Sequence, residues 1–368
     1  MTALKNVGAK KILLVKLSSL GDVVHALPVV QDIRAAMPDA QIDWVIEKSF
    51  QPLLAQCPGL RRSIACEIRR WRKSFWTAAT RSEWRAFTAQ LQLEAYDAVI
   101  DLQGLTKSAL VARLARLAPG GKRYALANQT DGSGYEAPSR WVADVAIRME
   151  PHIHAVQRSR DLAARALGYS LGSAPNFGLK VPAASNIRAQ EAIENIACEV
   201  PARAVALVHG TSRADKEWPL AHWVELGQRL RAAGWQIALL HGNPRELGTS
   251  QAIALALNQA ATGGSGGQVP VAHILPLLSL DALTQELAQC VGVIGVDSGV
   301  SHIAVALDLP HVQIYNFDTA WRTGPLASGK PAQPARQVSV FATPAPSVQA
   351  VWQAWLACTA KQAPVAAG

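Results

Sequence analysis

Residues 11–30 read KILLVKLSSLGDVVHALPVV, and this stretch decides the fold class. Ile12–Val15 is a short, uninterrupted apolar run of the kind that forms a strand buried on both faces. Lys16, two serines, a glycine and Asp22 follow before a helical pattern begins. A strand-to-helix connection needs only a glycine and one capping residue. The additional polar groups therefore indicate a ligand site, because open α/β sheets bind ligands at the C-terminal ends of their strands.

Apolar runs alternate with amphipathic segments through both halves of the chain. Continuous apolar strands that alternate with helices predict parallel sheets covered on both faces. We therefore expect an α/β protein with two doubly wound, Rossmann-like domains. The predicted strands are Ile12–Val15, Ile42–Ile46, Ser63–Glu67, Ala98–Asp101 and Arg123–Leu126 in the first half, and Ala204–Val208, Gln236–Leu240, Ala272–Leu275, Gly292–Val296 and Val312–Tyr315 in the second.

The 368 residues are enough for two domains, each with its own core. We expect an N-terminal domain at 1–170, a linker rich in glycine and proline at 171–200, and a C-terminal domain at 201–345. A last helix is expected within 346–360, and packing back on the N-terminal domain is one arrangement open to it. Residues 263–267 read as a loop, and 361–368 as a frayed tail.

The composition describes a folded protein with an excess of positive charge. Hydrophobic residues make up 49% of the chain, and 36 Lys and Arg stand against 27 Asp and Glu, for a net charge of +9. This excess favours an anionic partner, which leaves nucleic acid, a membrane surface and a phosphorylated substrate open. The cysteines form no CxxC pair, which indicates neither a zinc site nor a disulfide framework. They are Cys57, Cys66, Cys198, Cys290 and Cys358.

Two loops of the second half follow predicted strands and carry residues that suit a nucleotide. Residues 205–219, VALVHGTSRADKEWP, place Thr211, Ser212 and Lys216 between a strand and a helix. Hydroxyls, backbone N–H groups and an ammonium at such a junction suit a phosphate, although a capped helix with a surface lysine is the plainer interpretation. Residues 239–248, LLHGNPRELG, present Glu246, and a carboxylate in such a loop often binds ribose hydroxyls.

A third loop, within residues 292–307 (GVIGVDSGVSHIAVAL), repeats this arrangement. In one interpretation, Asp297 and Ser298 only cap the following helix. In the other, Gly299 lets a diphosphate approach the backbone closely, and the N-terminus of the helix points at it. His302 lies further into the helix, where a structural role is expected. Three such loops in one half favour a phosphorylated ligand. Neither G-x-G-x-x-G after a strand nor G-x-x-x-x-G-K-[ST] occurs, so a nicotinamide enzyme and a P-loop NTPase lose support.

Several longer motifs give the chain a resemblance to a known family. The segments KLSSLGDVVHALP (16–28), TSRADKEWP (211–219) and DSGVSH (297–302) resemble the ADP-heptose lipopolysaccharide heptosyltransferases, glycosyltransferase family 9. The match covers most of the chain in the right order. The segments IRRWRK (68–73) and YDAVIDLQGLTKS (96–108) are similar to the heptosyltransferase I group, which adds the first heptose to the Kdo of the lipopolysaccharide inner core.

The resemblance implies a GT-B fold, in which two Rossmann-like domains face each other across a cleft. It implies that the first domain binds the acceptor, Kdo2-lipid A, and the second mainly binds the donor, ADP-L-glycero-β-D-manno-heptose. The implied reaction inverts the anomeric centre and uses no metal ion and no cofactor. The residues agree with this, because they offer no DxD-like pair and no His/Cys cluster for a metal.

The resemblance also implies roles for individual residues. Asp22 matches the family's candidate general base, which takes the acceptor hydroxyl's proton on the face opposite the leaving ADP; its alternative role is to cap the following helix. Lys216 is implied as the main positive charge for the departing diphosphate. The implied donor-binding residues are Ser19, Gly21, Thr211, Ser212, Lys216, Glu246, Asp297, Ser298, Gly299 and His302.

A basic segment rich in tryptophan is implied as the acceptor side. Between Arg61 and Arg85, eight Arg and Lys stand against Glu67 and Glu83, with three tryptophans among them. A solvated charged face and a nucleic-acid-binding surface are both open interpretations of such a segment. The resemblance implies instead that the cations meet phosphates and carboxylates of the lipid acceptor, with the tryptophans near the lipid interface. The implied acceptor-binding residues are Ser18, Arg69, Arg70, Arg72, Lys73, Lys107, Arg140 and Arg158.

The chain departs from the family pattern in two places. Where relatives have an arginine-glutamate-proline element, residues 134–138 read GYEAP, which makes Arg140 the substitute for the acceptor arginine. After the strand Val312–Tyr315, residues 316–319 read NFDT in place of a glycine-proline turn. This change leaves the ligand contacts of that loop undefined.

We therefore expect a cytoplasmic, monomeric enzyme, peripheral on the cytoplasmic face of the inner membrane, whose partners are ADP-heptose and Kdo2-lipid A and not nucleic acid. No signal peptide or membrane-spanning segment is expected from the sequence. Three alternatives stay open. They are a heptosyltransferase II acting on heptosyl-Kdo2-lipid A, a basic nucleic-acid-binding α/β protein, and a sugar-nucleotide sensor without turnover.

Overall fold

The computed structural model describes residues 9–172, 174–181, 203–259, 271–326 and 335–360. The chain divides into two compact units, which we call unit 1 (Met1–Gly178) and unit 2 (Leu179–Gly368). Most of the expected linker, the expected loop at 263–267 and the expected tail at 361–368 lie outside the described residues. The two units are described separately below.

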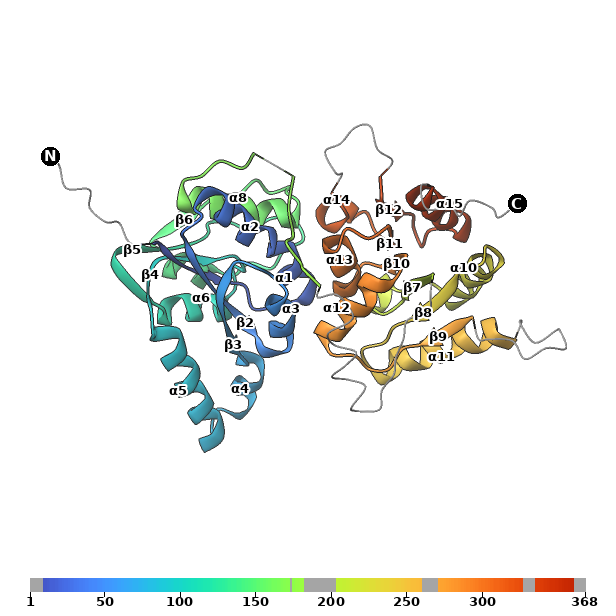
Figure 1. The fold of residues 1–368 in the computed structure, drawn as a ribbon. Helices are drawn as coiled ribbons and strands as arrows, with labels where there is room; N and C mark the ends of the chain where they lie inside the picture. The colour runs from blue at the N-terminus through green and yellow to red at the C-terminus, as the bar shows by residue number, and fades with distance from the viewer. Residues whose placement is uncertain (1–8, 173, 182–202, 260–270, 327–334, 361–368) are drawn as a thin grey trace. The chain divides into compact units, whose positions relative to one another are not determined.

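Unit 1 is built on a parallel six-stranded sheet (Figure 1). Its strand order is β3-β2-β1-β4-β5-β6, and all neighbouring pairs are parallel. This is the order of a doubly wound fold, in which the winding reverses between β1 and β4. The strands are β1 Lys11–Val15, β2 Gln41–Glu47, β3 Leu60–Cys66, β4 Ala95–Asp101, β5 Arg116–Leu126 and β6 Val145–Ile147.

Helices of unit 1 form two groups around this sheet. Helices α1 and α2 pack with α8, whereas α4, α5, α6 and α7 pack one against the next. Their bounds are α1 Leu20–Ala26, α2 Pro28–Ala36, α3 Gln51–Ala55, α4 Ile68–Ser74, α5 Ala78–Gln92, α6 Thr106–Leu114, α7 Ala137–Val142 and α8 Ala155–Leu167, and a 3-10 turn, η1, spans Lys48–Phe50.

Unit 2 repeats the same topology. Its parallel sheet has the order β12-β11-β10-β7-β8-β9, so the winding reverses between β7 and β10. The strands are β7 Ala204–Val208, β8 Gln236–Leu239, β9 Ala272–Ile274, β10 Gly292–Val296, β11 His311–Tyr315 and β12 Gln337–Phe341. The helices are α10 Leu220–Ala232, α11 Pro244–Gln259, α12 Leu280–Gln289, α13 Gly299–Ala306, α14 Ala320–Thr323 and α15 Val348–Thr359, with a 3-10 turn, η3, at Ala214–Lys216.

The last helix, α15, packs within unit 2. Val351 and Trp355 are completely buried in the core of this unit, and the helix contacts β11, β12 and α10. The Trp235 and Trp355 rings meet edge to face, 6.2 Å apart. Packing back on the N-terminal half was one arrangement we considered for this helix, but its buried face belongs to the unit 2 core.

The central strands of both sheets are buried as their composition predicts. Every residue of β7, β10 and β11 is buried, as are four of the five residues of β1. Their apolar side chains are covered on both faces by the helices that follow each strand. The predicted strands are all present. The edge strands β6 and β12 were missed because they are only partly buried, and β6 also has only three residues.

Candidate functional site

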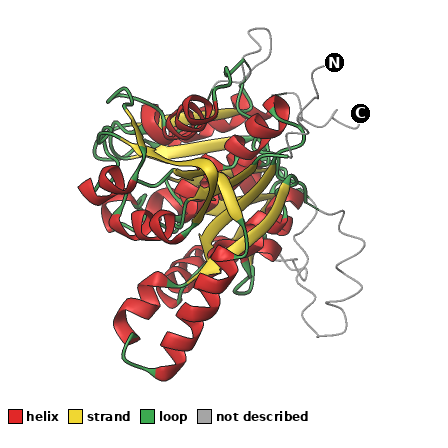
Figure 2. Ribbon diagram, turned by 90° about the vertical axis from the view of Figure 1, so that its left-hand side faces the viewer, coloured by secondary structure: helices red, strands yellow, loops and turns green. Residues whose placement is uncertain are grey.

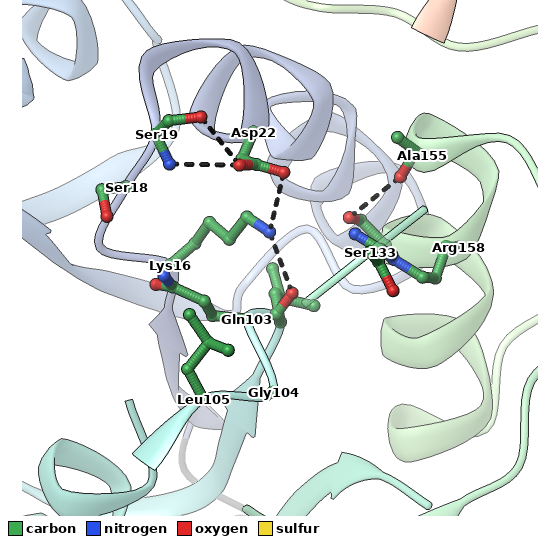
Figure 3. A network of polar contacts seen from close by, with 12 residues as sticks. Lys16, Ser18, Ser19, Asp22, Gln103, Gly104, Leu105, Ser133, Ala155 and Arg158 are labelled. Atoms are coloured by element: carbon green, nitrogen blue, oxygen red, sulfur yellow. Dashed lines mark hydrogen bonds and ion pairs between the residues drawn. The ribbon is translucent and has the colours of Figure 1, made fainter. Parts of the chain in front are cut away.

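The loop after β1 presents Asp22 at the start of α1. Ser19 is the residue that precedes this helix, and Asp22 is its third residue. The Asp22 Oδ2 atom accepts hydrogen bonds from the Ser19 backbone N–H at 3.1 Å and from the Ser19 hydroxyl at 2.8 Å (Figure 3). The Asp22 side chain is still 41% exposed. Asp22 therefore closes the first turn of the helix and also presents a carboxylate to solvent.

Lys16 lies behind this carboxylate, and we had assigned it no role from the sequence. Its ammonium is 3.6 Å from Asp22 Oδ1 (Figure 3). It also donates a hydrogen bond to the Leu102 carbonyl at 3.2 Å. The Lys16 side chain is only 3% exposed. A lysine directly after a buried apolar strand was the available signal, because a buried ammonium requires a partner.

The Lys16–Asp22 pair keeps Asp22 ionised. Burial alone would raise the pKa of Asp22, but the Lys16 ammonium and the Ser19 hydrogen bonds together hold it well below its usual range. His25 also lowers it. Burial lowers the pKa of Lys16, and the nearby Arg158 adds to this effect, whereas Asp22 opposes both. Asp22 is thus a carboxylate at neutral pH, which is the form that accepts a proton.

Two cations from other elements meet at Ser18. Lys107, on α6, donates to the Ser18 hydroxyl at 2.6 Å, and Arg69, on α4, donates to the same oxygen at 3.1 Å. Ser18 itself is buried. The Glu47 carboxylate also interacts with both cations. Two positive groups thus face one carboxylate and one neutral hydroxyl, and this arrangement suits an anionic group of a ligand.

Asp101, at the end of β4, fixes the start of the helix α6, which carries Lys107. This completely enclosed carboxylate accepts hydrogen bonds from the backbone N–H groups of Gln103 and Gly104 and from the hydroxyls of Ser108 and Ser139. Burial nevertheless raises its pKa. Because it ties β4 to both α6 and α7, Asp101 orders this side of the site, and the sequence reasoning assigned it no such role.

The departure at residues 134–138 has a structural explanation. Glu136 accepts a hydrogen bond from the Thr106 backbone N–H at 2.7 Å, at the start of α6. A carboxylate at this position satisfies a free N–H group of the helix and favours its dipole. Glu136 therefore supports the helix that carries Lys107, while Arg140 is exposed in the last turn of α7.

The remaining acceptor candidates are not gathered at Ser18. Arg158 is buried and donates to the Thr130 hydroxyl at 2.8 Å. Arg70 is ion-paired with Glu67 and Glu83 and lines a cavity of about 730 Å³ between β3, α4 and α5. Arg72 and Lys73 are exposed on α4. These positions stay predictions for acceptor contacts.

In unit 2, Lys216 and Asp297 form a tight ion pair. The Lys216 ammonium lies 2.6 Å from Asp297 Oδ2, and His302 Nε2 lies 3.3 Å from Asp297 Oδ1. Burial would raise the pKa of Asp297, but His302 and Lys216 together hold it well below its usual range. Thr211 joins the same group, since its hydroxyl donates to the Asp297 carbonyl at 3.2 Å. The loops after β7 and β10 therefore meet at Lys216.

The rest of the DSGVSH segment forms the start of α13. Ser298 precedes the helix, and its hydroxyl accepts a weak hydrogen bond from the Ser301 N–H at 3.4 Å. Gly299 is the first helical residue. His302 is buried, which agrees with the structural role we expected, but it also contacts Asp297. Ser212 is exposed in the loop before η3.

Glu246 lies against the loop that carries Thr211. It accepts a hydrogen bond from the Gly242 N–H at 2.7 Å and covers Gly210. A Cβ atom at Gly210 would be 2.5 Å from the Glu246 carboxyl carbon. A cavity of about 150 Å³ is lined by Gly210, Thr211 and Glu246, among others. The loops after β7 and β8 thus share one cavity, which the separate sequence motifs did not show.

The NFDT segment supports the loop of Lys216. The buried Asn316 side chain donates to the backbone carbonyls of Asp215 at 3.1 Å and Glu217 at 2.9 Å. These two residues flank Lys216 in the chain. Asn316 therefore fixes the position of η3, a role that the sequence reasoning left open.

The described part of the chain contains neither a metal-binding cluster nor a helix able to span a membrane. Within it, no three His, Cys, Asp or Glu side chains are grouped closely enough to hold a metal ion. None of the described helices combines the length and apolar character needed to cross a membrane. The cysteines among the described residues, Cys57, Cys66, Cys290 and Cys358, are buried and free.

Comparisons with known proteins agree on one family. Residues 84–338 match the model of glycosyltransferase family 9 (heptosyltransferase). The chain is 36% identical over 316 residues to lipopolysaccharide heptosyltransferase 1 of Pseudomonas aeruginosa, covering 85% of this chain and 81% of that one. Lipopolysaccharide heptosyltransferase 2 of Salmonella typhimurium is 25% identical over 324 residues, 86% of each chain.

A solved structure of one relative extends the match to the fold. The Escherichia coli heptosyltransferase WaaC is 32% identical, and the match covers 93% of this chain and 98% of that one. The TM-score is 0.74 for its complex with ADP and 0.70 for its complex with ADP-2-deoxy-2-fluoro heptose. This agreement confirms the predicted GT-B fold. The chain belongs to glycosyltransferase family 9, the heptosyltransferases.

Proposed function

We propose that this glycosyltransferase moves heptose from ADP-heptose to the Kdo of Kdo2-lipid A, in synthesis of the lipopolysaccharide inner core. The observation that carries the proposal is the exposed Asp22 carboxylate, held ionised by Lys16 at the position where the sheet of unit 1 reverses its winding. Family membership and the higher identity to heptosyltransferase 1 than to heptosyltransferase 2 support the choice of substrates.

On the acceptor side, Asp22 acts as general base. As the Kdo hydroxyl attacks the anomeric carbon, the Asp22 carboxylate takes its proton, and attack opposite the departing ADP inverts that carbon. Oδ2 is oriented by Ser19, while Oδ1 faces Lys16. Lys107 and Arg69, which meet at Ser18, hold an anionic group of the acceptor beside the base.

On the donor side, Lys216 stabilises the leaving group. Negative charge grows on the diphosphate as the bond to heptose breaks, and an ammonium already in position lowers the energy of that state. Thr211, Ser212 and the N–H groups of Ser298 and Gly299 complete the diphosphate site, and Glu246 holds the ribose. Asp297 keeps Lys216 in place in the free protein and contacts the heptose hydroxyls when donor is bound. Ser19 and Gly21 complete the donor contacts from unit 1.

The proposal includes a reaction without a metal ion or cofactor, since Lys216 supplies the charge that a divalent cation supplies in other transferases. The enzyme acts as a monomer, and its lipid acceptor keeps it peripheral on the cytoplasmic face of the inner membrane. Turnover that survives EDTA and a monomeric mass in size-exclusion chromatography are the expected results.

Transfer itself is measured by incubating the full chain with ADP-heptose and Kdo2-lipid A. We expect ADP release and a lipid product whose mass has increased by one heptose. A parallel reaction uses heptosyl-Kdo2-lipid A. Product from the second acceptor alone would assign the chain to the heptosyltransferase II reaction, and donor binding without any product would make it a sensor.

The Lys16–Asp22 pair predicts a change in pH dependence. The folded pKa of Asp22 lies below its ordinary value, so the base stays ionised as pH falls from neutral, and kcat/KM of the native enzyme should stay flat from about pH 8 to about pH 5. In Lys16→Met, the effect of burial is no longer opposed by the ammonium, so the Asp22 pKa rises and kcat/KM falls on the acid side.

The measurement is a kcat/KM profile for both proteins. The other charged groups near the pair include His25, Arg158, Asp101 and Lys107, and all of them remain in the variant and are common to both curves. A uniform loss at all pH values, with no new acid limb, would show that Lys16 only supports the fold.

A further inference from the structure

A chain of buried polar side chains runs from the core of unit 2 to Lys216. His302 on α13 lies between Asp297 and Gln313, with its Nε2 atom 3.3 Å from Asp297 Oδ1 and its Nδ1 atom 3.4 Å from the Gln313 amide nitrogen. Gln313 belongs to β11, which lies between β10 and β12 in a sheet whose strands are enclosed by helices (Figures 1 and 2). Gln313 is completely buried, so its polar atoms need partners inside the protein.

His311 extends this chain, because it lies two residues before Gln313 and so on the same face of β11. His311 is completely buried, and its Nδ1 atom lies 3.0 Å from the Val293 carbonyl oxygen. A carbonyl oxygen only accepts hydrogen bonds, so Nδ1 carries a proton. Burial lowers the pKa of His311 to about 4, and the ring is therefore neutral at neutral pH. Its Nε2 atom is then a buried acceptor that needs a donor.

The orientation of the Gln313 amide decides whether that donor exists. With the amide nitrogen toward His302, the Gln313 oxygen and His311 Nε2 are both buried acceptors without a hydrogen bond. Rotation of the amide by half a turn exchanges its oxygen and nitrogen in place. The nitrogen then donates to the His311 ring, with which the Gln313 side chain interacts, and the oxygen faces His302 Nδ1. This second orientation is favoured, because an unpaired buried acceptor destabilises the fold.

The second orientation fixes the charge of His302. The Gln313 oxygen accepts only from a protonated Nδ1, and the Asp297 carboxylate accepts only from a protonated Nε2. His302 therefore carries two ring protons and is an imidazolium. Asp297 then lies between two cations, because the Lys216 ammonium is 2.6 Å from its other oxygen. Although burial raises the pKa of Asp297, these two neighbours hold it well below its usual range, as a carboxylate between two cations requires.

We propose that Gln313 keeps His302 doubly protonated, and that this imidazolium is the counter-charge that lets Lys216 leave Asp297 for the donor diphosphate. The Asp297 side chain is only 6% exposed, so water does not replace a departing ammonium. Removal of one partner from a buried ion pair is strongly unfavourable unless a second cation remains. Gln313 and His302 are thus positioning residues for Lys216. The inference rests on the proposed function only for the role of Lys216.

The protonation of His302 is measured by nuclear magnetic resonance on the full chain with isotope-labelled histidine. Proton–nitrogen correlations within the ring distinguish an imidazolium from each neutral tautomer. In the native chain at neutral pH we expect both His302 nitrogens to be protonated, and His302→Gln assigns the signal by its loss. Gln313→Leu removes the amide oxygen and should leave His302 with one proton. A native His302 with one proton would overturn the proposal, and this measurement does not depend on whether Gln313→Leu folds.

Affinity for ADP, measured by calorimetry, tests the consequence for Lys216. Gln313→Leu should weaken ADP binding about tenfold, the effect of losing a hydrogen bond to a charged group. The matched control is Gln337→Leu on β12, which removes an amide that donates to the Val305 and Leu309 carbonyls instead. This control should bind ADP as the native chain does. Unchanged affinity in Gln313→Leu, or an equal loss in both variants, would overturn the role of Gln313.

Activity separates this inference from the proposed function. A doubly protonated native His302, with weakened ADP binding in Gln313→Leu but no heptose transfer by the native chain, would remove the proposed function and support the inference for nucleotide binding. Transfer by a native chain whose His302 carries one proton would remove the inference alone.

Discussion

Asp22→Ala is expected to reduce kcat by about 10²–10⁴-fold, the range that a general base contributes. Donor affinity should change by no more than a few-fold, because the proposed nucleotide contacts come mainly from unit 2. The reduction is expected in single-turnover measurements as well, since the lost step is the chemical one. Binding of ADP, followed by calorimetry, provides the separate measurement of affinity.

The competing explanation for Asp22 is helix capping, and the structure supports that contact too. Loss of a cap costs about 1 kcal/mol of folding free energy and leaves catalysis largely intact. Asp22→Asn separates the roles, because the amide retains an oxygen for the Ser19 hydrogen bonds but cannot take a proton. A nearly active Asp22→Asn would reduce Asp22 to a structural residue.

A first-turn carboxylate elsewhere provides the control. Asp281 is the second residue of α12, after Ser279, and so lies in a first turn one position earlier than Asp22 does in α1. Asp281→Ala should lower stability by a similar amount and leave kcat unchanged. If both variants lost activity equally, helix stability rather than proton transfer would explain the result.

Lys216→Ala should weaken catalysis and donor binding together. Loss of one positioned electrostatic donor costs about 2.7–4 kcal/mol of transition-state stabilisation, or about 10²–10³-fold in kcat. Affinity for ADP should fall too, because the ammonium meets the diphosphate in the ground state as well. Steady-state rates and ADP calorimetry on the same preparation measure the two effects.

The ion pair with Asp297 complicates this variant and suggests its controls. Removal of Lys216 leaves the buried Asp297 carboxylate without its closest cation, although His302 still contacts it, so the melting temperature must be measured in parallel. Lys216→Arg should recover part of the activity. Arg213→Ala removes an exposed cation from the same loop, one paired with Asp215, and should have little effect. An equal loss in Arg213→Ala would implicate the charge of the whole loop rather than Lys216.

Much of the fold was predictable because its signals are local. Uninterrupted apolar runs such as Ile12–Val15 and Ala204–Val208 form the central strands. Because these strands are buried on both faces, nearly every one of their residues has to be apolar. The edge strands Val145–Ile147 and Gln337–Phe341 were missed because strands that are only partly buried need no continuous apolar run. The last helix was predicted, but the surface on which it packs was not. That surface depends on which parts of the two sheets the other helices leave uncovered.

The candidate site was predictable as motifs and less so as geometry. Asp22, Lys216 and Glu246 stand out because each follows a strand of apolar residues. Lys16 and Asn316 were assigned no role, because their partners, the Leu102 carbonyl and the backbone beside Lys216, lie far away in the chain. The link from Asp101 to α7 was missed for the same reason, because Ser139 is 38 residues away. Linear spacing carries no information about such partners.

Glu246 and Gly210 are 36 residues apart in the chain, but their side-chain positions compete for the same space. The carboxylate occupies the space that any side chain at position 210 would need, with its oxygens 2.7 and 2.8 Å from an added Cβ. A methyl group there would require the Glu246 carboxylate to shift within the small cavity that it shares with Thr211. The absence of a side chain at position 210 therefore lets Glu246 occupy its place beside Thr211, where we propose that it holds the ribose.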